Sequence, residues 1–159
     1  MTAANQTQPT AVFMMGGPGS GKSFVRDRDF AGLAVVDCDS IKESHPDYDP
    51  KNPSALHEWS RIECVKAFFR ALGGDDSFVY DGTGTNAEKM VEWMLKAQEA
   101  GFKVQLVYVK CPLQTALRRN QQRDRTVPES IVREKHAVVE TTFKILTGYA
   151  DEVTEVQNG

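Results

Sequence analysis

The sequence predicts an α/β fold, namely a three-layer α/β/α sandwich built on a mostly parallel, five-stranded sheet. Short apolar runs alternate with helical segments along the whole chain. The first of these runs has no polar alternation, which is typical of strands that are buried on both faces. Alternating strands and helices need crossover connections, and these make neighbouring strands parallel and put helices on both faces of the sheet.

Five runs rich in apolar residues are the expected strands. The fourth is the clearest, because it consists largely of β-branched and aromatic residues. The last follows the final helical segment and is short. The five runs are 11–15 (AVFMM), 33–37 (LAVVD), 77–81 (SFVYD), 103–109 (KVQLVYV) and 151–156 (DEVTEV).

Capping and stop residues bound the helices expected between these strands. Ser54 is the expected cap of a helix that stops at Gly73, and Asn86 caps one that ends before Gly101. A Thr-x-x-Glu capping box begins at Thr126 and opens a helix that runs to about residue 146. Four aromatic residues fall at helical spacings and are expected in the core. They are Trp59, Phe68, Phe69 and Trp93.

Length and composition indicate one ordinary globular domain. The chain has 159 residues, of which 40% are hydrophobic and 26% charged. We expect a flexible tail over 1–10 and a single domain over 11–159. The net charge of −3 argues against a protein that coats nucleic acid or an anionic membrane.

No apolar run approaches the roughly 20 residues that span a bilayer, and the N-terminus lacks a signal-peptide pattern. The cysteines Cys38, Cys64 and Cys111 are odd in number and scattered, without metal-ligand spacing. Reduced thiols in a cytoplasmic protein are their simplest interpretation.

Residues 16–23 read GGPGSGKS and match the Walker A pattern G-x-x-x-x-G-K-[ST] at every fixed position. Glycines let the backbone fold tightly around an anion, and the following helix adds its positive N-terminal end. The lysine reaches the β- and γ-phosphates, and the hydroxyl after it binds the bridging Mg²⁺. The motif predicts an ATP and Mg²⁺ site on a P-loop NTPase fold. Its expected nucleotide contacts are Gly17, Pro18, Gly19, Ser20, Gly21, Lys22 and Ser23.

Carboxylates follow the second and third expected strands. The carboxyl ends of the strands line the ligand crevice of a doubly wound sheet, so Asp39 is expected beside the triphosphate. An acceptor hydroxyl needs a base that orients it and takes its proton, and Asp39 suits this role. The alternative is that Asp39 caps a helix that begins near Ser40. Asp37 is expected to be a turn or supporting residue.

Three further side chains are candidates for binding the acceptor or the metal. Asp81, after the third strand, is expected to hold a Mg²⁺-bound water or to contact the acceptor, and its alternative is a simple turn aspartate. Thr83 lies at the same edge of the sheet and is a candidate acceptor ligand. Tyr48, in the turn-rich loop 45–54, is a candidate stacking partner for an acceptor.

Four arginines within residues 118–125 form a local positive patch on this acidic chain. Arg119 and Arg123 are four residues apart and therefore share one face of a helix. Planar guanidinium groups stabilise the charge that phosphoryl transfer spreads over equatorial oxygens. The patch predicts a mobile lid in which Arg119, Arg123 and Arg125 are catalytic. A solvated helix face is the alternative.

From about residue 11 to residue 146 the chain resembles the small P-loop kinases that include zeta toxins and polynucleotide kinases. Its segment VVDCDSIKESHPDYDP looks like the zeta-toxin segment in which an aspartate is the acceptor base, and Asp39 matches that position. The segment ALRRNQQRDRTVPESIV looks like the polynucleotide-kinase lid. Arg119 and Arg123 match the two lid arginines, and Arg125 matches the arginine before Val-Pro in zeta toxins. The resemblance implies a nucleoside-kinase-like fold with a short arginine-bearing lid.

We therefore expect an ATP-dependent kinase that phosphorylates a hydroxyl of a nucleic acid or nucleotide, such as a polynucleotide 5′ end or a hydroxymethylated base. A zeta-toxin-like kinase of a UDP-activated amino sugar or another small metabolite is the first alternative. A nucleotide-binding NTPase switch is the alternative from another class. Lys22, Asp39 and the lid arginines are the expected catalytic groups. A monomer without a membrane partner is expected, and the resemblance leaves room for an antitoxin-like partner.

Overall fold

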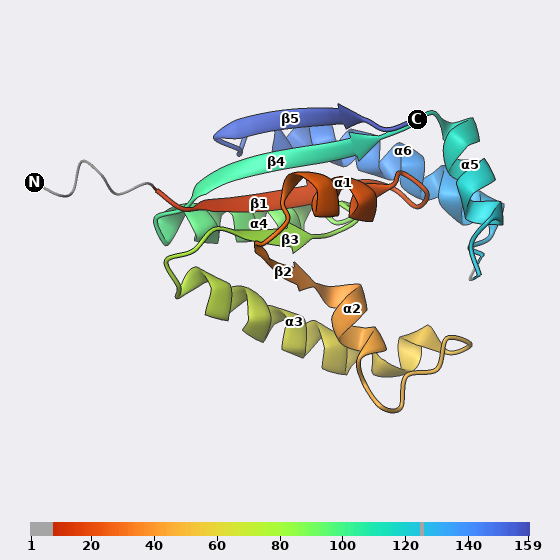
Figure 1. Cartoon of the computed structure of the whole chain (residues 1–159), viewed down its shortest axis with the longest axis horizontal. Helices are drawn as coiled ribbons and strands as arrows, with labels where there is room; N and C mark the ends of the chain where they lie inside the picture. Colours follow the sequence, from red (N-terminus) through yellow and green to blue (C-terminus); the bar gives the residue numbers. More distant parts are fainter. Residues whose placement is uncertain (1–7, 125) are drawn as a thin grey trace, which may run out of the picture.

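The computed structural model describes residues 8–124 and 126–159 (Figure 1). One parallel sheet forms its centre, with the strand order β2-β3-β1-β4-β5. The predicted α/β class and the five strands are confirmed, with bounds that differ by only a residue at most ends. The strands are β1 (Thr10–Met15), β2 (Ala34–Asp37), β3 (Phe78–Asp81), β4 (Lys103–Lys110) and β5 (Glu152–Gln157).

Helices cover both faces of the sheet, but unequally. The helices are α1 (Lys22–Asp29), α2 (Cys38–Glu43), the 3₁₀ helix η2 (Pro53–Leu56), α3 (His57–Leu72), α4 (Ala87–Glu99), α5 (Leu113–Gln121) and α6 (Glu129–Leu146). The larger core cluster joins one face of the sheet to α3, α4 and α6, whereas α1 packs against the other face. In Figure 1, α2 and α5 stand beyond the carboxyl ends of the strands.

The core on the three-helix face is aromatic at its centre. Phe68 of α3 is fully buried and stacks on Trp93 of α4, with ring centroids 4.1 Å apart. Burying a side chain of this size contributes about 1.5–3 kcal/mol. The prediction that Trp59 and Phe69 belong to the core is wrong, because they are 36% and 48% exposed. The stripe of α3 that faces the core carries smaller residues beside Phe68, namely Ser60 and Cys64.

Two of the predicted helix caps differ from those observed. Asn86 caps α4 as predicted, because its side chain accepts a hydrogen bond from the backbone N–H of Lys89. Ser54 instead lies inside the 3₁₀ helix that precedes α3. Thr126 donates to the carbonyl of Arg123, and Pro128 stands at the start of α6 without a side-chain cap. Pro128 is the N-cap residue and has extended backbone, so α6 begins at Glu129 without the capping box.

The chain enters the fold before the first strand. The side-chain amide of Gln8 donates to the carbonyl of Gly101, and β1 begins at Thr10. Of the predicted tail, residues 1–7 lie outside the described part of the chain.

A disulfide joins Cys38, the first residue of α2, to Cys64 in the middle of α3. Their Cα atoms lie 5.3 Å apart, within the usual range for a disulfide. The prediction that all three cysteines are reduced thiols is therefore wrong for these two, whereas Cys111 is free and buried. Sequence spacing concealed the pair because 26 residues separate them and only the packing of α2 on α3 brings them together.

Among the described residues, none of the helices has the length and apolar character needed to cross a membrane.

Candidate active site

A cleft of about 730 Å³ opens at the carboxyl edge of the sheet. The loop after β1 forms its floor. Residues at the ends of β2 and β3 line it, and so do residues of α5 and of the segment that follows α5. In Figure 1 the ends of β2 and β3 and helix α5 lie on either side of the loop after β1. The strand order produces this arrangement, because β1 lies between β3 and β4. Sites predicted from separate parts of the chain line the cleft together. They are residues 17–23, Asp39, Asp81, Thr83, Arg119 and Arg123.

The loop of residues 16–21 depends on its glycines. Gly19 and Gly21 have φ angles of +81° and +83°, which side chains rarely adopt. A Cβ at Gly19 would lie 2.5 Å from the carbonyl oxygen of Ala116, so glycine also lets α5 approach the loop. Helix α1 begins at Lys22 and directs its free N–H groups toward the cleft. The loop and the helix together form an anion-binding surface.

Lys22 and Asp81 belong to a buried charge network. The ammonium of Lys22 lies 2.9 Å from Oδ1 of Asp81 and donates to the carbonyl of Gly82 at 2.7 Å. Oδ2 of Asp81 accepts from Arg26 at 2.6 Å, and the Arg26 guanidinium also lies 3.5 Å from Asp37. The side chain of Asp81 is only 3% exposed, so its charge is balanced by these two cations. The network fixes Lys22 at the edge of the loop.

The end of β2 assigns different roles to its two aspartates. Oδ1 of Asp37 accepts hydrogen bonds from the backbone N–H groups of Asp39 and Ser40, at 3.0 and 3.2 Å. Asp37 is therefore the N-cap of α2, and the alternative that Asp39 caps this helix is wrong. Asp39 is exposed in the first turn of α2 and lines the cleft. Its carboxylate is available for a ligand.

The negative charges at this side of the cleft meet at Tyr80. Burial, together with the charges of Asp37, Asp39 and Asp81, raises the pKa of Tyr80 to about 12. A tyrosine phenol is protonated at neutral pH in any case, and the raised pKa of Tyr80 extends this to more alkaline pH, so Tyr80 presents a neutral hydrogen-bonding group beside three carboxylates. Tyr80 lines the cleft and is 6% exposed.

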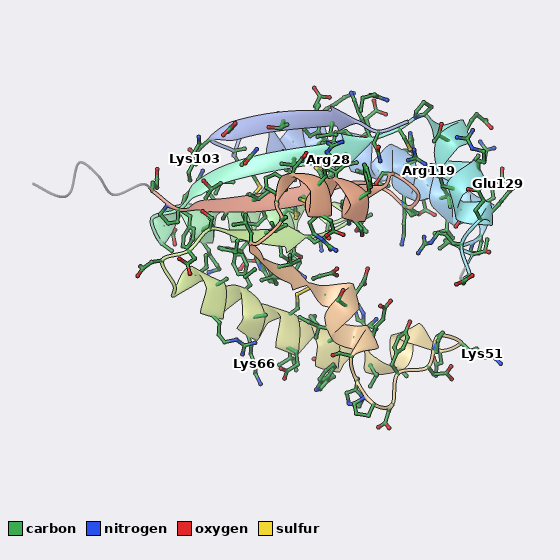
Figure 2. All side chains as sticks on the ribbon, viewed as in Figure 1. Arg28, Lys51, Lys66, Lys103, Arg119 and Glu129 are labelled. Carbon is green, nitrogen blue, oxygen red and sulfur yellow. A yellow bond between two sulfur atoms is a disulfide. The ribbon has the colours of Figure 1, made fainter. Side chains whose placement is uncertain are left out.

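The arginine patch contributes two side chains to the opposite side. Nη1 of Arg119 donates to the carbonyls of Gly19 and Ser20, at 3.1 and 3.2 Å, and thereby ties α5 to the phosphate loop. Figure 2 shows Arg119 at this end of the sheet, beside the loop. Arg123 is exposed and lines the cleft. The third predicted arginine, Arg125, lies outside the described residues.

Asn120 is a part of this side that the sequence analysis missed. Its Nδ2 donates to the carbonyl of Val127 at 2.6 Å, and its Oδ1 accepts from the N–H of Val127 at 3.0 Å. The side chain is almost completely buried. This paired contact closes the loop that carries Arg123, so Asn120 is a positioning residue. In the sequence, Asn120 follows two arginines and precedes two glutamines, and this polar setting gave no signal of burial.

We expect Asn120→Leu to destabilise the protein by about 1–3 kcal/mol, because it leaves two backbone groups of Val127 without partners. It should also lower the turnover that the sequence predicts to depend on Arg123. Urea unfolding and kcat measure the two effects. Gln121→Leu, at the exposed neighbouring position, is the matched control and should change neither.

Three other residues extend the site beyond the sequence prediction. Arg26 follows Lys22 by one helical turn, and this spacing was the available signal. Lys89, at the start of α4, and Lys135 of α6 line the cleft.

Of the two remaining predicted ligands, Thr83 lines the cleft, with its Oγ1 3.3 Å from Oγ1 of Thr85. Tyr48 is not among the described residues that line the cleft.

The residues of the cleft fit a Mg²⁺ ion only together with a nucleotide. Ser23 lines the cleft at the start of α1 and offers a hydroxyl oxygen, a ligand type that Mg²⁺ accepts. Both oxygens of Asp81 are already paired with cations, so a metal ion bound at Asp81 would lie against the positive charges of Lys22 and Arg26. The described residues contain no group of three or more His, Cys, Asp or Glu side chains suited to a metal. Phosphate oxygens and water would supply the other ligands.

The sequence model of the zeta toxin family matches residues 1–158 of the chain. No curated protein matches it.

Several solved structures share the fold at low identity. A chain of the PezAT chromosomal toxin–antitoxin system of Streptococcus pneumoniae is 16% identical, with a TM-score of 0.71, and the match covers 95% of this chain and 69% of that one. A chain of the AvrRxo1-ORF1:AvrRxo1-ORF2 structure with sulphate ions is 20% identical, with a TM-score of 0.70, and the match covers 92% of this chain and 52% of that one. A chain of the Pnkp1/Rnl/Hen1 RNA repair complex is 16% identical, with a TM-score of 0.69, and the match covers 89% of this chain and 48% of that one. The chain thus spans about half the length of the last two.

Proposed function

The chain belongs to the zeta toxin family of P-loop kinases, and from this premise we propose that it transfers the γ-phosphoryl group of ATP to a hydroxyl of a nucleic acid or nucleotide. One observation carries the proposal. A carboxylate after β2 and a guanidinium after α5 line the same cleft on opposite sides of the phosphate loop. That is the arrangement that in-line phosphoryl transfer between two bound substrates requires.

Each group has a separate task in this reaction. The backbone N–H groups of the loop and the ammonium of Lys22 bind the phosphates, with Asp81 and Arg26 holding Lys22 in position. Asp39 orients the acceptor hydroxyl and accepts its proton. Arg123 balances the charge on the transferring group and excludes water. A Mg²⁺ held by Ser23 would neutralise phosphate charge when bound.

The nucleotide is proposed to be ATP. A related AvrRxo1 complex was solved with ATP, at 18% identity over 92% of this chain. The loop carries the glycines, lysine and serine through which P-loop proteins bind the phosphates of nucleoside triphosphates.

Lys89 supplies one cation among the carboxylates at the side of the cleft bordered by β2 and β3, and this cation supports an acceptor that carries a phosphate. Lys89 lines the cleft there, with its ammonium 4.8 Å from the centre of the Trp93 ring. Burial, with a smaller contribution from the positive charge of Arg61, lowers the pKa of Lys89, and no carboxylate of the described residues pairs with it. A phosphate group on the acceptor would offset the cost of holding this cation. This supports a nucleotide or nucleic acid over a neutral metabolite.

We expect Lys89→Met to raise the KM for a phosphate-bearing acceptor by about 10–100-fold, the loss of one charge-assisted hydrogen bond. The KM for ATP should stay the same, because Lys89 follows β3 rather than the phosphate loop. Steady-state kinetics with each substrate varied in turn measure both values. Lys96→Met is the matched control. Lys96 also belongs to α4 and lies over an aromatic ring, that of Phe69 in α3, but it is not among the described residues that line the cleft.

A panel of acceptors incubated with γ-labelled ATP tests the proposal. It includes 5′-hydroxyl oligonucleotides, hydroxymethylated bases, nucleotides, a UDP-activated amino sugar and neutral sugars. Label on the nucleic acids or nucleotides is the expected result. Label on the UDP-amino sugar alone would replace the proposed acceptor by the alternative that the zeta-toxin resemblance implies. ATP hydrolysis without any acceptor, unchanged in Asp39→Asn, would support an NTPase switch instead.

The same family relationship supports a protein partner. PezAT is described as a toxin–antitoxin system, and we extend that property to this chain as a proposal. An antitoxin-like protein that binds across the cleft would hinder both substrates at once.

A further inference from the structure

Helix α2 carries Asp39 and packs on α3, yet this packing is shallow. None of its six residues is fully buried. Cys38 and Ile41 are its two contacts with the main core, and both are only partly buried. The preceding strand, β2, is at the edge of the sheet, with Ala34 and Val35 exposed. Elements with so few buried contacts belong to the least stable parts of a fold.

The disulfide adds a covalent link to this shallow packing of α2 on α3. Cys38 is bonded to Cys64, which is fully buried in the part of α3 that faces the core. Cys38 is also the immediate neighbour of Asp37 and Asp39 and lines the cleft. The bond thus ties the backbone beside Asp39 directly to the rigid core.

We propose that the Cys38–Cys64 bond is a thiol–disulfide switch that controls phosphoryl transfer by fixing or releasing the helix that carries Asp39. The inference rests on the proposed function, because it assigns regulation to the same site. The disulfide form is the active one, since it holds Asp39 in the cleft. The reduced form has a less ordered α2 and transfers phosphate more slowly.

The chemistry needs a dithiol as co-reactant. Its thiolate attacks the sulfur of Cys38, which is half-buried at the cleft, and the S–S bond breaks as Cys64 leaves and takes up a proton. The second thiol of the reagent then attacks the mixed disulfide and releases Cys38. The protein disulfide gains two electrons and two protons, and the dithiol becomes a cyclic disulfide. A disulfide oxidant reverses the reaction.

The first test measures the kinetics of both forms of the wild-type chain, with thiols counted by alkylation and intact mass. Dithiothreitol should release two thiols and lower kcat/KM for the acceptor about five- to twentyfold. The KM for ATP should stay constant, because the phosphate loop joins β1 to α1 and the disulfide holds neither of these elements. A reduced protein with unchanged acceptor kinetics, or a protein whose Cys38 and Cys64 are already thiols under oxidising conditions, would overturn the proposal.

Variants separate this bond from general effects of the reagent. Cys38→Ser/Cys64→Ser should have the activity of the reduced wild type and no response to dithiothreitol. Cys111→Ser retains the pair and should respond as the wild type does. Should the double variant fail to fold, the wild type reduced and alkylated under native conditions replaces it, with the same expected activity.

A readout without catalysis distinguishes the switch from the proposed function. Reduction should increase amide hydrogen exchange in residues 38–43 and leave that of 10–23 unchanged. Equal exchange of 38–43 in both forms would contradict the switch, whatever the acceptor is. Full activity of Asp39→Asn would instead contradict the proposed function.

Discussion

Asp39→Asn is expected to lower kcat for acceptor phosphorylation by about 10²–10⁴-fold, the usual contribution of a general base. The asparagine keeps the size of the side chain and cannot accept the proton. ATP binding should be unchanged, because the proposed phosphate-binding groups are the loop after β1 and Lys22 rather than Asp39. Single-turnover transfer of labelled phosphate and equilibrium binding of ATP measure the two quantities.

The control for this substitution is Asp47→Asn, an exposed aspartate in the loop after α2 that lies outside the described lining of the cleft. It should have wild-type kinetics. An Asp39→Asn protein that transfers phosphate at the normal rate, or one whose loss lies entirely in ATP affinity, would contradict the assigned role.

Arg123→Ala is the second large effect. By analogy with arginine fingers we expect kcat to fall by about 10³–10⁵-fold, with a small change in the KM of either substrate. The reason is that the guanidinium is proposed to interact with charge that develops in the transition state. Arg123 is a cleaner test than Arg119, because Arg119 also holds the carbonyls of Gly19 and Ser20.

Arg118→Ala is the matched control, since Arg118 is an exposed arginine of α5, the helix that Arg123 follows, and is not among the described residues that line the cleft. Its kcat should remain that of the wild type. Equal losses in both variants would mean that the patch acts through its overall charge, and Arg123 would then have no specific role.

Much of the fold could be predicted because its signals are local. The strands are short apolar runs, and the phosphate loop is one continuous motif, so neither needs knowledge of distant residues. Parallel pairing followed from the alternation of strands and helices. The errors arose where a local pattern had two solutions. Trp59 and Phe69 have helical spacing, but α3 turns the smaller Ser60 and Cys64 toward the core.

The parts of the site that were missed depend on packing between distant segments. The Cys38–Cys64 bond and the contact of Asn158 with the carbonyl of Ser20 join residues that are far apart in the chain. Asn120 looks like a polar residue of an exposed segment until its partner Val127 is seen.

A crystal structure with a non-hydrolysable ATP analogue and a phosphorylatable acceptor would test the central claim most directly. The account predicts the acceptor hydroxyl within about 2.6–3.2 Å of the Asp39 carboxylate, the distance of a hydrogen bond. It also predicts the guanidinium of Arg123 on the γ-phosphate. A γ-phosphate bound in the loop with Asp39 and Arg123 both directed away from it would contradict the account.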